Sequence, residues 1–345
     1  MAVHEKANPG FPAGRRKAVS LAQSSLVKSS LLSPEGPFLL ILEPNMEGIN
    51  LVSWAAAQRP HLERQLVDHG GILFRGFSVG SAQQFKDFAR ALAGELIDYI
   101  ERAAPRSEVE KSVYTSTEFP ADQHIPMHHE MSYSHNWPAK IWFYCAQPPA
   151  SGGRTPIADG RKVLKRIDAG ICKRFVERKV MYVRNYGAGV DLPWQETFQT
   201  DDRSSVEDYC RQAHMSCEWK GKNGLQTRIV RPATVVHPKT GDAIWFNHAH
   251  MFHVSNLTPA VRNALLAEFR EDELPRNAFY GDGSPLEDSV LDEIRGIYEE
   301  TALRFDWQQG DILMLDNFLC AHGREPFVGP RRILVAMADL YTSEE

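Results

Sequence analysis

The sequence from residue 113 to residue 340 alternates short apolar, strand-like segments with turns rich in Pro and Gly. Segment 141–145 is typical of a buried strand, and the turn at 148–153 separates it from the next strand candidate. Helical stretches at 163–179 and 286–303 are inserted into this series. Many short strands with helices between or outside them favour a β-sandwich or jelly roll over a doubly wound parallel sheet. We therefore expect a mainly β fold with flanking helices.

The N-terminal third of the sequence carries two further predicted helices. Apolar residues at helical spacing predict helices at 51–68 and 83–97, and strand-like runs occur at 38–42 and 71–77. Pro60 lies inside the first helix, so that helix is either kinked or divided in two. These elements are expected to pack against the β core.

Residues 1–35 contain basic residues at 15–17, followed by a run rich in Ser and Leu. Polar residues interrupt the apolar part of this run, and no small-residue cleavage pattern follows it. We expect residues 1–35 to be a mobile N-terminal tail and residues 36–345 to form a single domain.

Charge and cysteine content exclude several classes of function. The net charge is −5, which gives no electrostatic reason to expect nucleic acid or an anionic membrane as a partner. The densest apolar run, at 38–42, has the length of a buried strand and is too short to cross a membrane. Five cysteines without close paired spacing indicate neither a disulfide framework nor a zinc ribbon. We expect a cytoplasmic protein.

A possible metal site begins at His128-His129-Glu130. In an extended segment, residues i and i+2 point to the same side, so His128 and Glu130 would present an imidazole and a carboxylate to one point. A second histidine from elsewhere would complete a 2-His-1-carboxylate face, which suits non-haem Fe(II). Because His-x-Glu is frequent by chance, a structural histidine is the alternative unless the chain supplies this partner.

The C-terminal part of the sequence supplies the missing groups. Strands of a jelly roll wind so that an early strand lies beside a late one, and His322 follows a late strand candidate at 311–315. Arg332 begins the final strand, and its guanidinium fork matches the carboxylate of a 2-oxoacid. Thr155 follows a Gly-Gly turn, and its hydroxyl is expected to contact the same carboxylate. For Arg332 alone, a structural salt bridge is the alternative interpretation.

The order of these motifs resembles the Fe(II)/2-oxoglutarate dioxygenases of the taurine dioxygenase (TauD/TfdA) family. His-x-Glu is followed by Gly-Gly-x-Thr and then by a distal His and Gly-Pro-Arg-Arg-Ile. The resemblance implies a double-stranded β-helix core of the jelly-roll or cupin-like kind, with Fe(II), 2-oxoglutarate and O2 as cofactor and co-substrates. It also implies that the iron ligands are His128, Glu130 and His322. The implied anchors of the co-substrate are Thr155 and Arg332.

Two departures from the family pattern narrow the range of possible substrates and reactions. Most members have Asp where this chain has Glu130, and Glu130 with the following Met-Ser-Tyr is similar to the branch that contains clavaminate synthase and the SyrP-like aspartyl β-hydroxylases. Retention of Glu130 argues against halogenation. Ala336 stands where taurine dioxygenase has a second arginine, which argues against taurine.

The branch implies hydroxylation of an unactivated C–H in secondary metabolism, with release of succinate and CO2. The substrate is expected to be amino-acid-derived, either a free small molecule or an aminoacyl group tethered to a carrier protein. Desaturation, epoxidation and cyclisation use the same cofactor chemistry and stay open. A zinc- or manganese-dependent hydrolase with the same ligands, and a non-catalytic jelly-roll binding module, are the rival interpretations.

A second group of histidines, His248, His250 and His253, competes with the first as a metal site. On a strand, His248 and His250 share a side but His253 does not, and the run contains no Asp, Glu or Cys. Packing or hydrogen bonding is therefore the favoured role for this group. The side chains expected to meet the substrate are Ser132, Tyr133, His250 and Arg228.

Overall fold

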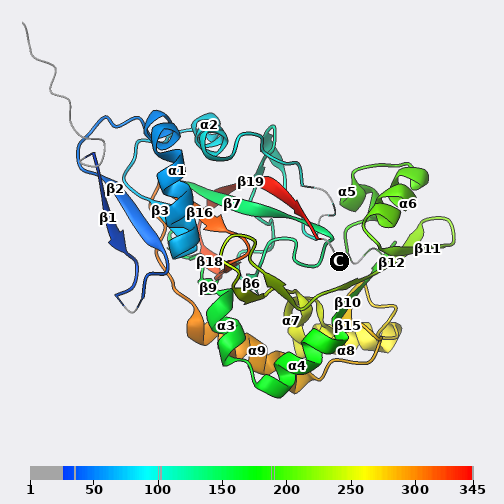
Figure 1. The fold of residues 1–345 in the computed structure, drawn as a ribbon. Coiled ribbons are helices and arrows are strands. Elements are labelled where there is room, and N and C mark those ends of the chain that lie inside the picture. Colours follow the sequence, from blue (N-terminus) through cyan, green and yellow to red (C-terminus); the bar gives the residue numbers. More distant parts are fainter. Residues whose placement is uncertain are drawn as a thin grey trace, which may run out of the picture.

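An eight-stranded sheet forms the centre of the computed structural model, which describes residues 26–34, 36–99, 101, 103–187, 189 and 191–343 (Figure 1). Its pairings are antiparallel except that between β2 and β3. In spatial order its strands are β1 (Val27–Leu31), β2 (Leu40–Pro44), β3 (Gly71–Phe74), β16 (Ile312–Asp316), β7 (Asn136–Gln147), β19 (Arg332–Thr342), β5 (Val113–Thr115) and β4 (Glu108–Glu110).

Helices α1 (Leu51–His69) and α2 (Ala82–Ala93) cover one face of this sheet (Figure 1). Side chains alternate along the central strands, so that Trp142 and Leu334 join the core beneath these helices. Phe143 and Val335 face the other way, into a second core. The site described below lies on this second side, away from α1 and α2.

A smaller sheet lies against the second face and contains β6 (Ile125–His128), β17 (Cys320–Arg324) and β9 (Ile157–Asp159). Both pairings with β17 are antiparallel, and His322 lies directly opposite His128. The expected winding, in which an early strand pairs with a late one, is therefore present. It brings together residues that are far apart in the sequence.

A third sheet, with its own buried core, is flanked by helices. Its strands, in spatial order, are β11 (Ser216–Lys220), β12 (Gly224–Arg231), β10 (Val180–Tyr186) and β15 (Arg276–Tyr280). The helices of this half of the chain are α3 (Gly160–Arg166), α4 (Ala169–Arg178), α5 (Trp194–Phe198), α6 (Arg203–Gln212), α7 (Ala249–Phe252), α8 (Pro259–Glu268), α9 (Asp288–Thr301) and the short 3-10 helix η2 (Val254–Asn256). Two further strand pairs are β13 (Thr234–Val236) with β14 (Ala243–Trp245), and β8 (Ser151–Gly152) with β18 (Phe327–Val328).

The strand-rich architecture with flanking helices confirms the expected fold class. Pro60 is accommodated within one continuous helix, α1. The single helix expected at 163–179 is two helices, because the Asp168 carboxylate accepts hydrogen bonds from the main-chain N–H groups of Gly170 and Ile171 and so starts α4. The expectation of a tail up to residue 35 is wrong for β1, which pairs with β2 at the edge of the large sheet. Residues 1–25 lie outside the described part of the chain.

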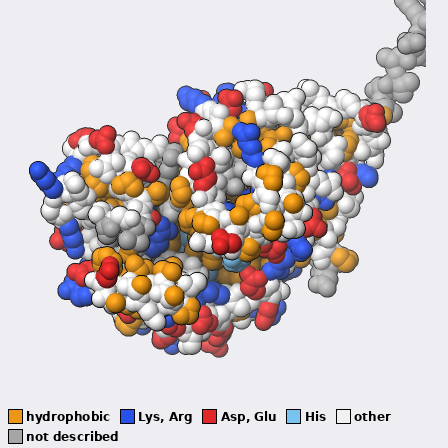
Figure 2. Space-filling model, turned by 180° about the vertical axis from the view of Figure 1, so that it is seen from behind, with side chains coloured by type: hydrophobic (Ala, Val, Ile, Leu, Met, Phe, Trp, Pro, Cys, Tyr) orange, Lys and Arg blue, Asp and Glu red, His pale blue; other side chains and the backbone are white. Residues whose placement is uncertain are grey.

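Within the described residues, no helix is both long enough and apolar enough to cross a membrane. On the face shown in Figure 2, Lys and Arg side chains are interspersed with Asp and Glu. This mixed surface agrees with the small net negative charge of the chain.

Candidate metal centre and cavity

Three side chains, His128, Glu130 and His322, converge at one point of the structure. Each offers one ligand atom, and these atoms all lie within 4.8 Å of one another. His128 ends β6, His322 lies opposite it in β17, and Glu130 follows in the turn after β6. His322 Nε2 is 3.8 Å from Glu130 Oε2. Among the described residues, this is the cluster of His, Cys, Asp or Glu side chains whose geometry suits a metal ion.

The protonation states of this cluster fit a divalent cation. His128 Nδ1 donates to the carbonyl of Pro126 (2.8 Å), which leaves the Nε2 lone pair free for a metal. Burial lowers the pKa of His128 to about 3, so the imidazole is neutral at pH 7. Burial opposes ionisation of Glu130, but Arg106 and the two histidines hold its pKa well below the usual range. Two imidazole nitrogens and one carboxylate are the donor set that suits Fe(II).

The side chain of Asn317 fixes the backbone of Glu130. Its Oδ1 accepts from the Glu130 N–H (2.7 Å), and its Nδ2 donates to the Glu130 carbonyl (2.9 Å) and to that of Pro138 (2.8 Å). His129 points away from the cluster and donates through Nδ1 to the Asn317 carbonyl (2.8 Å). We call the hydrogen bonds between Asn317 and the backbone of Glu130 the Asn317 clamp. The sequence did not predict this clamp because its partners are 187 residues apart.

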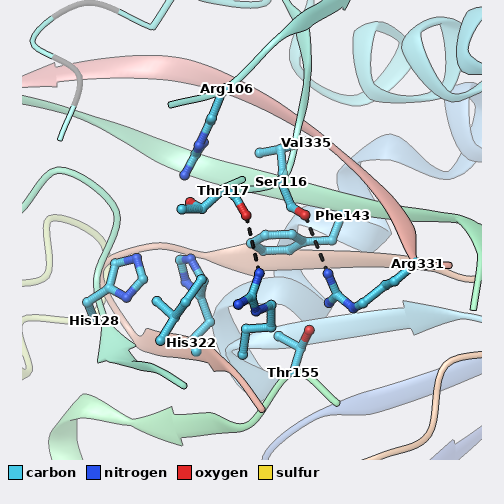
Figure 3. Close-up of a pocket in the computed structure, with 12 residues that line it drawn as sticks. Arg106, Ser116, Thr117, His128, Phe143, Thr155, His322, Arg331 and Val335 are labelled. Atoms are coloured by element: carbon cyan, nitrogen blue, oxygen red, sulfur yellow. Dashed lines mark hydrogen bonds between the residues drawn. The ribbon is translucent and has the colours of Figure 1, made fainter. Parts of the chain in front are cut away.

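A cavity borders the two histidines, between the large sheet and the β6–β17–β9 sheet (Figure 3). Phe143 and Val335 form its apolar wall on the side of the large sheet. Thr155 lines it from the opposite side, and its Oγ1 accepts a hydrogen bond from Trp307 Nε1 (3.1 Å). The cavity thus combines an apolar wall with polar groups beside the metal cluster.

Arg331 lies in this cavity, held by Gly153 and Ser116. Its Nε donates to the Gly153 carbonyl (3.1 Å) and its Nη1 to Ser116 Oγ (3.4 Å), as Figure 3 shows for Ser116. Burial lowers the pKa of Arg331 to about 10, which still leaves the guanidinium charged at pH 7. A fixed cation next to the Thr155 hydroxyl is suited to bind a carboxylate.

The expected anchor, Arg332, does not line the cavity. Its side chain is exposed at the start of β19, whereas its neighbour Arg331 lines the cavity. Successive residues of an extended chain point to opposite sides, so adjacent arginines cannot both face one cavity. Val335, four residues after Arg331, also lines the cavity, whereas Ala336 does not.

Two further arginines that the sequence did not single out border the same cavity. Arg106 Nη2 donates to Glu130 Oε2 (2.9 Å), and its guanidinium lies over the ring of Tyr99, 4.6 Å from the centroid. Arg324 donates to four main-chain carbonyls of the loop 117–123. Arg324 therefore holds a loop, whereas Arg106 lies beside a candidate metal ligand.

Comparison with known proteins identifies the family. Residues 37–337 match the family described as taurine catabolism dioxygenase TauD, TfdA family. The chain belongs to this family. TauD/TfdA enzymes use Fe(II), 2-oxoglutarate and O2, so the chain is a 2-oxoglutarate-dependent non-haem iron dioxygenase. This assignment decides against the metal-dependent hydrolase and the non-catalytic binding module.

Relatives and solved structures agree with the TauD/TfdA assignment. The dapdiamide synthesis protein DdaC of Enterobacter agglomerans is 44% identical over 285 residues, which cover 82% of this chain and 87% of DdaC. A clavaminate synthase-like protein of Arabidopsis thaliana is 33% identical over 291 residues, covering 81% of this chain and 84% of the relative. The crystal structure of PvcB from Pseudomonas aeruginosa, 18% identical, has a TM-score of 0.55 and covers 92% of this chain and 93% of PvcB. The last similarity shows that the jelly-roll fold is shared.

The four side chains expected to meet the substrate of this TauD/TfdA enzyme do not line the cavity. Ser132 Oγ is hydrogen-bonded to His248 Nδ1 (2.6 Å), and the Tyr133 hydroxyl donates to the Glu101 carbonyl (2.7 Å). Arg228 is on the surface, 42% exposed, with Asp272 3.7 Å away. Alternation along β12 turns Arg228 outward, between the buried Thr227 and Ile229.

The fourth of these side chains, His250, belongs to the second group of histidines. It lies in the short helix α7, where strand geometry does not apply. His250 Nε2 donates to the Met127 carbonyl (2.8 Å), and the ring lies against Tyr298. His253 Nδ1 is hydrogen-bonded to Ser255 Oγ (2.9 Å). The hydrogen bonds of His250 and His253 go to protein groups and do not converge on one point.

Proposed function

We propose that this dioxygenase holds Fe(II) with His128, Glu130 and His322 and hydroxylates an unactivated C–H of an amino-acid-derived substrate. The observation that carries the proposal is the buried three-ligand cluster at the edge of a cavity that also contains Arg331. In this proposal Arg331, together with Thr155, binds the carboxylate of 2-oxoglutarate, the role first expected for Arg332.

When bound, Fe(II) and 2-oxoglutarate activate O2 for attack on a C–H bond, with release of succinate and CO2. The residues of the chain hold the reactants in place and exclude water. The hydrogen bond from His128 to Pro126 and the Asn317 clamp on Glu130 fix the metal ligands before the metal binds. Phe143 packs edge-on against His322, with ring centroids 4.9 Å apart, and so both orients this ligand and keeps it dry.

Arg331 is proposed to bind the distal carboxylate of 2-oxoglutarate. Gly153 and Ser116 each accept a hydrogen bond from the guanidinium, so its orientation is fixed by the protein. The Thr155 hydroxyl keeps its hydrogen available for a carboxylate oxygen, because its oxygen is the acceptor for Trp307. A dicarboxylate thus finds a cation at one end and the metal cluster at the other.

The relatives support an amino-acid-derived substrate in secondary metabolism. DdaC, at 44% identity, is named for dapdiamide synthesis, and the plant relative is named for its likeness to clavaminate synthase. Val335 in the cavity wall supplies no cation for a sulfonate, which agrees with a substrate other than taurine. We also propose a cytoplasmic location, supported by the five free cysteines.

The test is oxygen-dependent conversion of 2-oxoglutarate to succinate with added Fe(II), in the presence of free amino acids or of carrier-bound aminoacyl thioesters. A product heavier by one oxygen indicates hydroxylation or epoxidation, and a loss of two hydrogens indicates desaturation or cyclisation. His128→Ala should abolish turnover, whereas His61→Ala, on the exposed surface of α1, should not change it. Full activity of His128→Ala would refute the ligand assignment.

A further inference from the structure

A buried cation, Arg106, borders the cavity next to the metal cluster, in addition to Arg331 and Arg324. Figure 3 shows Arg106 and Arg331 approaching the cavity from different sides. Arg106 precedes β4, whereas Arg331 precedes β19 at the other end of the chain. The side chains of Arg106 and its partner Glu130 are only 4% and 3% exposed. Water therefore contributes little to stabilising the charge of Arg106.

The Glu130 carboxylate faces both Arg106 and His322 of the metal cluster. Oε2 is 2.9 Å from Arg106 Nη2 and 3.8 Å from His322 Nε2. When the carboxylate binds a divalent cation, its negative charge is shared with that cation, and the cation also repels the guanidinium. The pairing between Arg106 and Glu130 is therefore weaker in the metal-loaded protein.

The co-substrate does not compensate Arg106 for this weaker pairing. In the proposed function, one carboxylate of 2-oxoglutarate lies at the metal and the other at Arg331, so both of its charges are already used. A buried guanidinium whose anionic partner is drawn to a metal is unfavourable unless another anion approaches it. The remaining component of the reaction is the substrate.

We propose that Arg106 binds a carboxylate of the substrate, so that this dioxygenase selects molecules with a free carboxylate. The proposal rests on the function proposed above. Arg106 borders the same cavity as His128 and His322, so a molecule held by Arg106 lies beside the metal cluster. An aminoacyl thioester has no free α-carboxylate, and a carrier-bound substrate would therefore need an acidic side chain.

The geometry of Arg106 supports binding of an anion. Its guanidinium lies over the ring of Tyr99, with Cζ 4.6 Å from the centroid, and this contact restricts the movement of the fork. An arginine fork in a fixed plane binds a carboxylate through two parallel hydrogen bonds, which a neutral amide cannot match. The residue of β19 that lines the cavity is the uncharged Val335, so a cation for the substrate has to come from another element.

The test measures binding to the chain loaded with Mn(II) and N-oxalylglycine, which do not turn over. The probes are L-amino acids, N-acetylated amino acids and dipeptides, each paired with its α-carboxamide, together with Asp and Asn, and Glu and Gln. Calorimetry should show that acids bind about 10- to 100-fold more tightly than their amides. Arg106→Gln should remove this preference, and Arg106→Lys should retain part of it. The control Arg64→Gln removes an exposed charge from α1 and should leave the preference unchanged.

Equal binding of acids and amides to the wild-type chain, or no binding of any acid, would overturn the proposal without any variant. An acid preference that persists in Arg106→Gln would also overturn it. If Arg106→Gln weakens Mn(II) binding and affects acids and amides alike, Arg106 only positions Glu130. Failure of the wild-type chain to bind Mn(II) and N-oxalylglycine would instead contradict the proposed function, and the two failures are thus distinguishable.

Discussion

Glu130 is the side chain on which most interactions of the site converge. Its carboxylate contacts Arg106 and faces His322, and its main chain is held on both sides by Asn317. Burial alone would favour the neutral acid, so the neighbouring positive charge and the hydrogen bonds keep it ionised. A pre-ionised carboxylate binds a metal without first having to release a proton.

Arg331 and Arg332 offer a matched test of the co-substrate anchor. Arg331→Gln should raise the KM for 2-oxoglutarate by about 10- to 100-fold, because a charged hydrogen bond to a carboxylate contributes about 1.5–3 kcal/mol. Arg332→Gln removes the same charge from an exposed position and should change the KM less than about twofold. Steady-state assays of succinate formation check both values. The reverse order of effects would restore Arg332 as the anchor.

Asn317 carries a separate prediction about the metal ligands. Asn317→Ala leaves the N–H and carbonyl of Glu130 without their buried partner, and the free energy of unfolding should fall by about 2–4 kcal/mol. Metal affinity should fall about 10- to 100-fold, as for other groups that orient a ligand.

The control for Asn317 is Asn256→Ala, which removes a hydrogen bond from Nδ2 to the Met251 carbonyl at a half-buried position. It should cost about 1 kcal/mol and leave metal affinity unchanged. Denaturant unfolding and Mn(II) titration measure the two quantities. Unchanged metal affinity in Asn317→Ala would show that the clamp is dispensable for the ligands.

At the scale of elements, the pairing of β6 with β17 brings the proposed metal ligands together. Pairing places His128 opposite His322, and the register shifts beside this pair, between His322 and Arg324. Gly323 lies in this shift, where an added Cβ would be 2.6 Å from the main-chain oxygen of Ile125. A side chain at this position would therefore push the two strands apart.

Gly323→Ala should accordingly lower both stability and metal affinity. Overpacking against backbone costs about 1–3 kcal/mol, and the shift moves His128 relative to His322. Gly296→Ala is the matched control, because Gly296 lies in α9 with no heavy atom within 4 Å of an added Cβ. It should stabilise the chain by about 0.5–1 kcal/mol and leave metal affinity unchanged. Unfolding curves measure the stability of both variants, and Mn(II) titration measures their metal affinity. If Gly323→Ala binds the metal as tightly as the wild type, the close approach of residue 323 to Ile125 is not needed to place the ligands.

The order of elements predicted the partner of His128 because jelly-roll winding constrains which strands meet. The same reasoning could not choose between Arg331 and Arg332, since a shift of one residue reverses the side on which a side chain points. It also missed Arg106 and Asn317, whose roles come from contacts in space and leave no local pattern. The division between α3 and α4 depended on a single capping carboxylate, that of Asp168.

At the scale of the whole molecule, the proposed metal ligands are far apart in the sequence but meet on one face of the large sheet. α1 and α2 cover the opposite face, so their packing supports the site without contributing to the cavity. The ligands come from β6, the turn after it and β17, so the cluster forms only when an early and a late strand are paired. Metal binding should therefore be coupled to folding of the domain.

This coupling predicts that a metal and a co-substrate analogue raise the melting temperature together. A ligand that binds only the folded chain stabilises it by about 2.7 kcal/mol at 100 times its Kd. For a domain of this size that free energy corresponds to a rise in Tm of several degrees, with Mn(II) and N-oxalylglycine each measured alone and then combined. His322→Ala should abolish the response to Mn(II), and Arg331→Gln should reduce only the added response to N-oxalylglycine. An undiminished response to N-oxalylglycine in Arg331→Gln would separate the co-substrate site from this cavity.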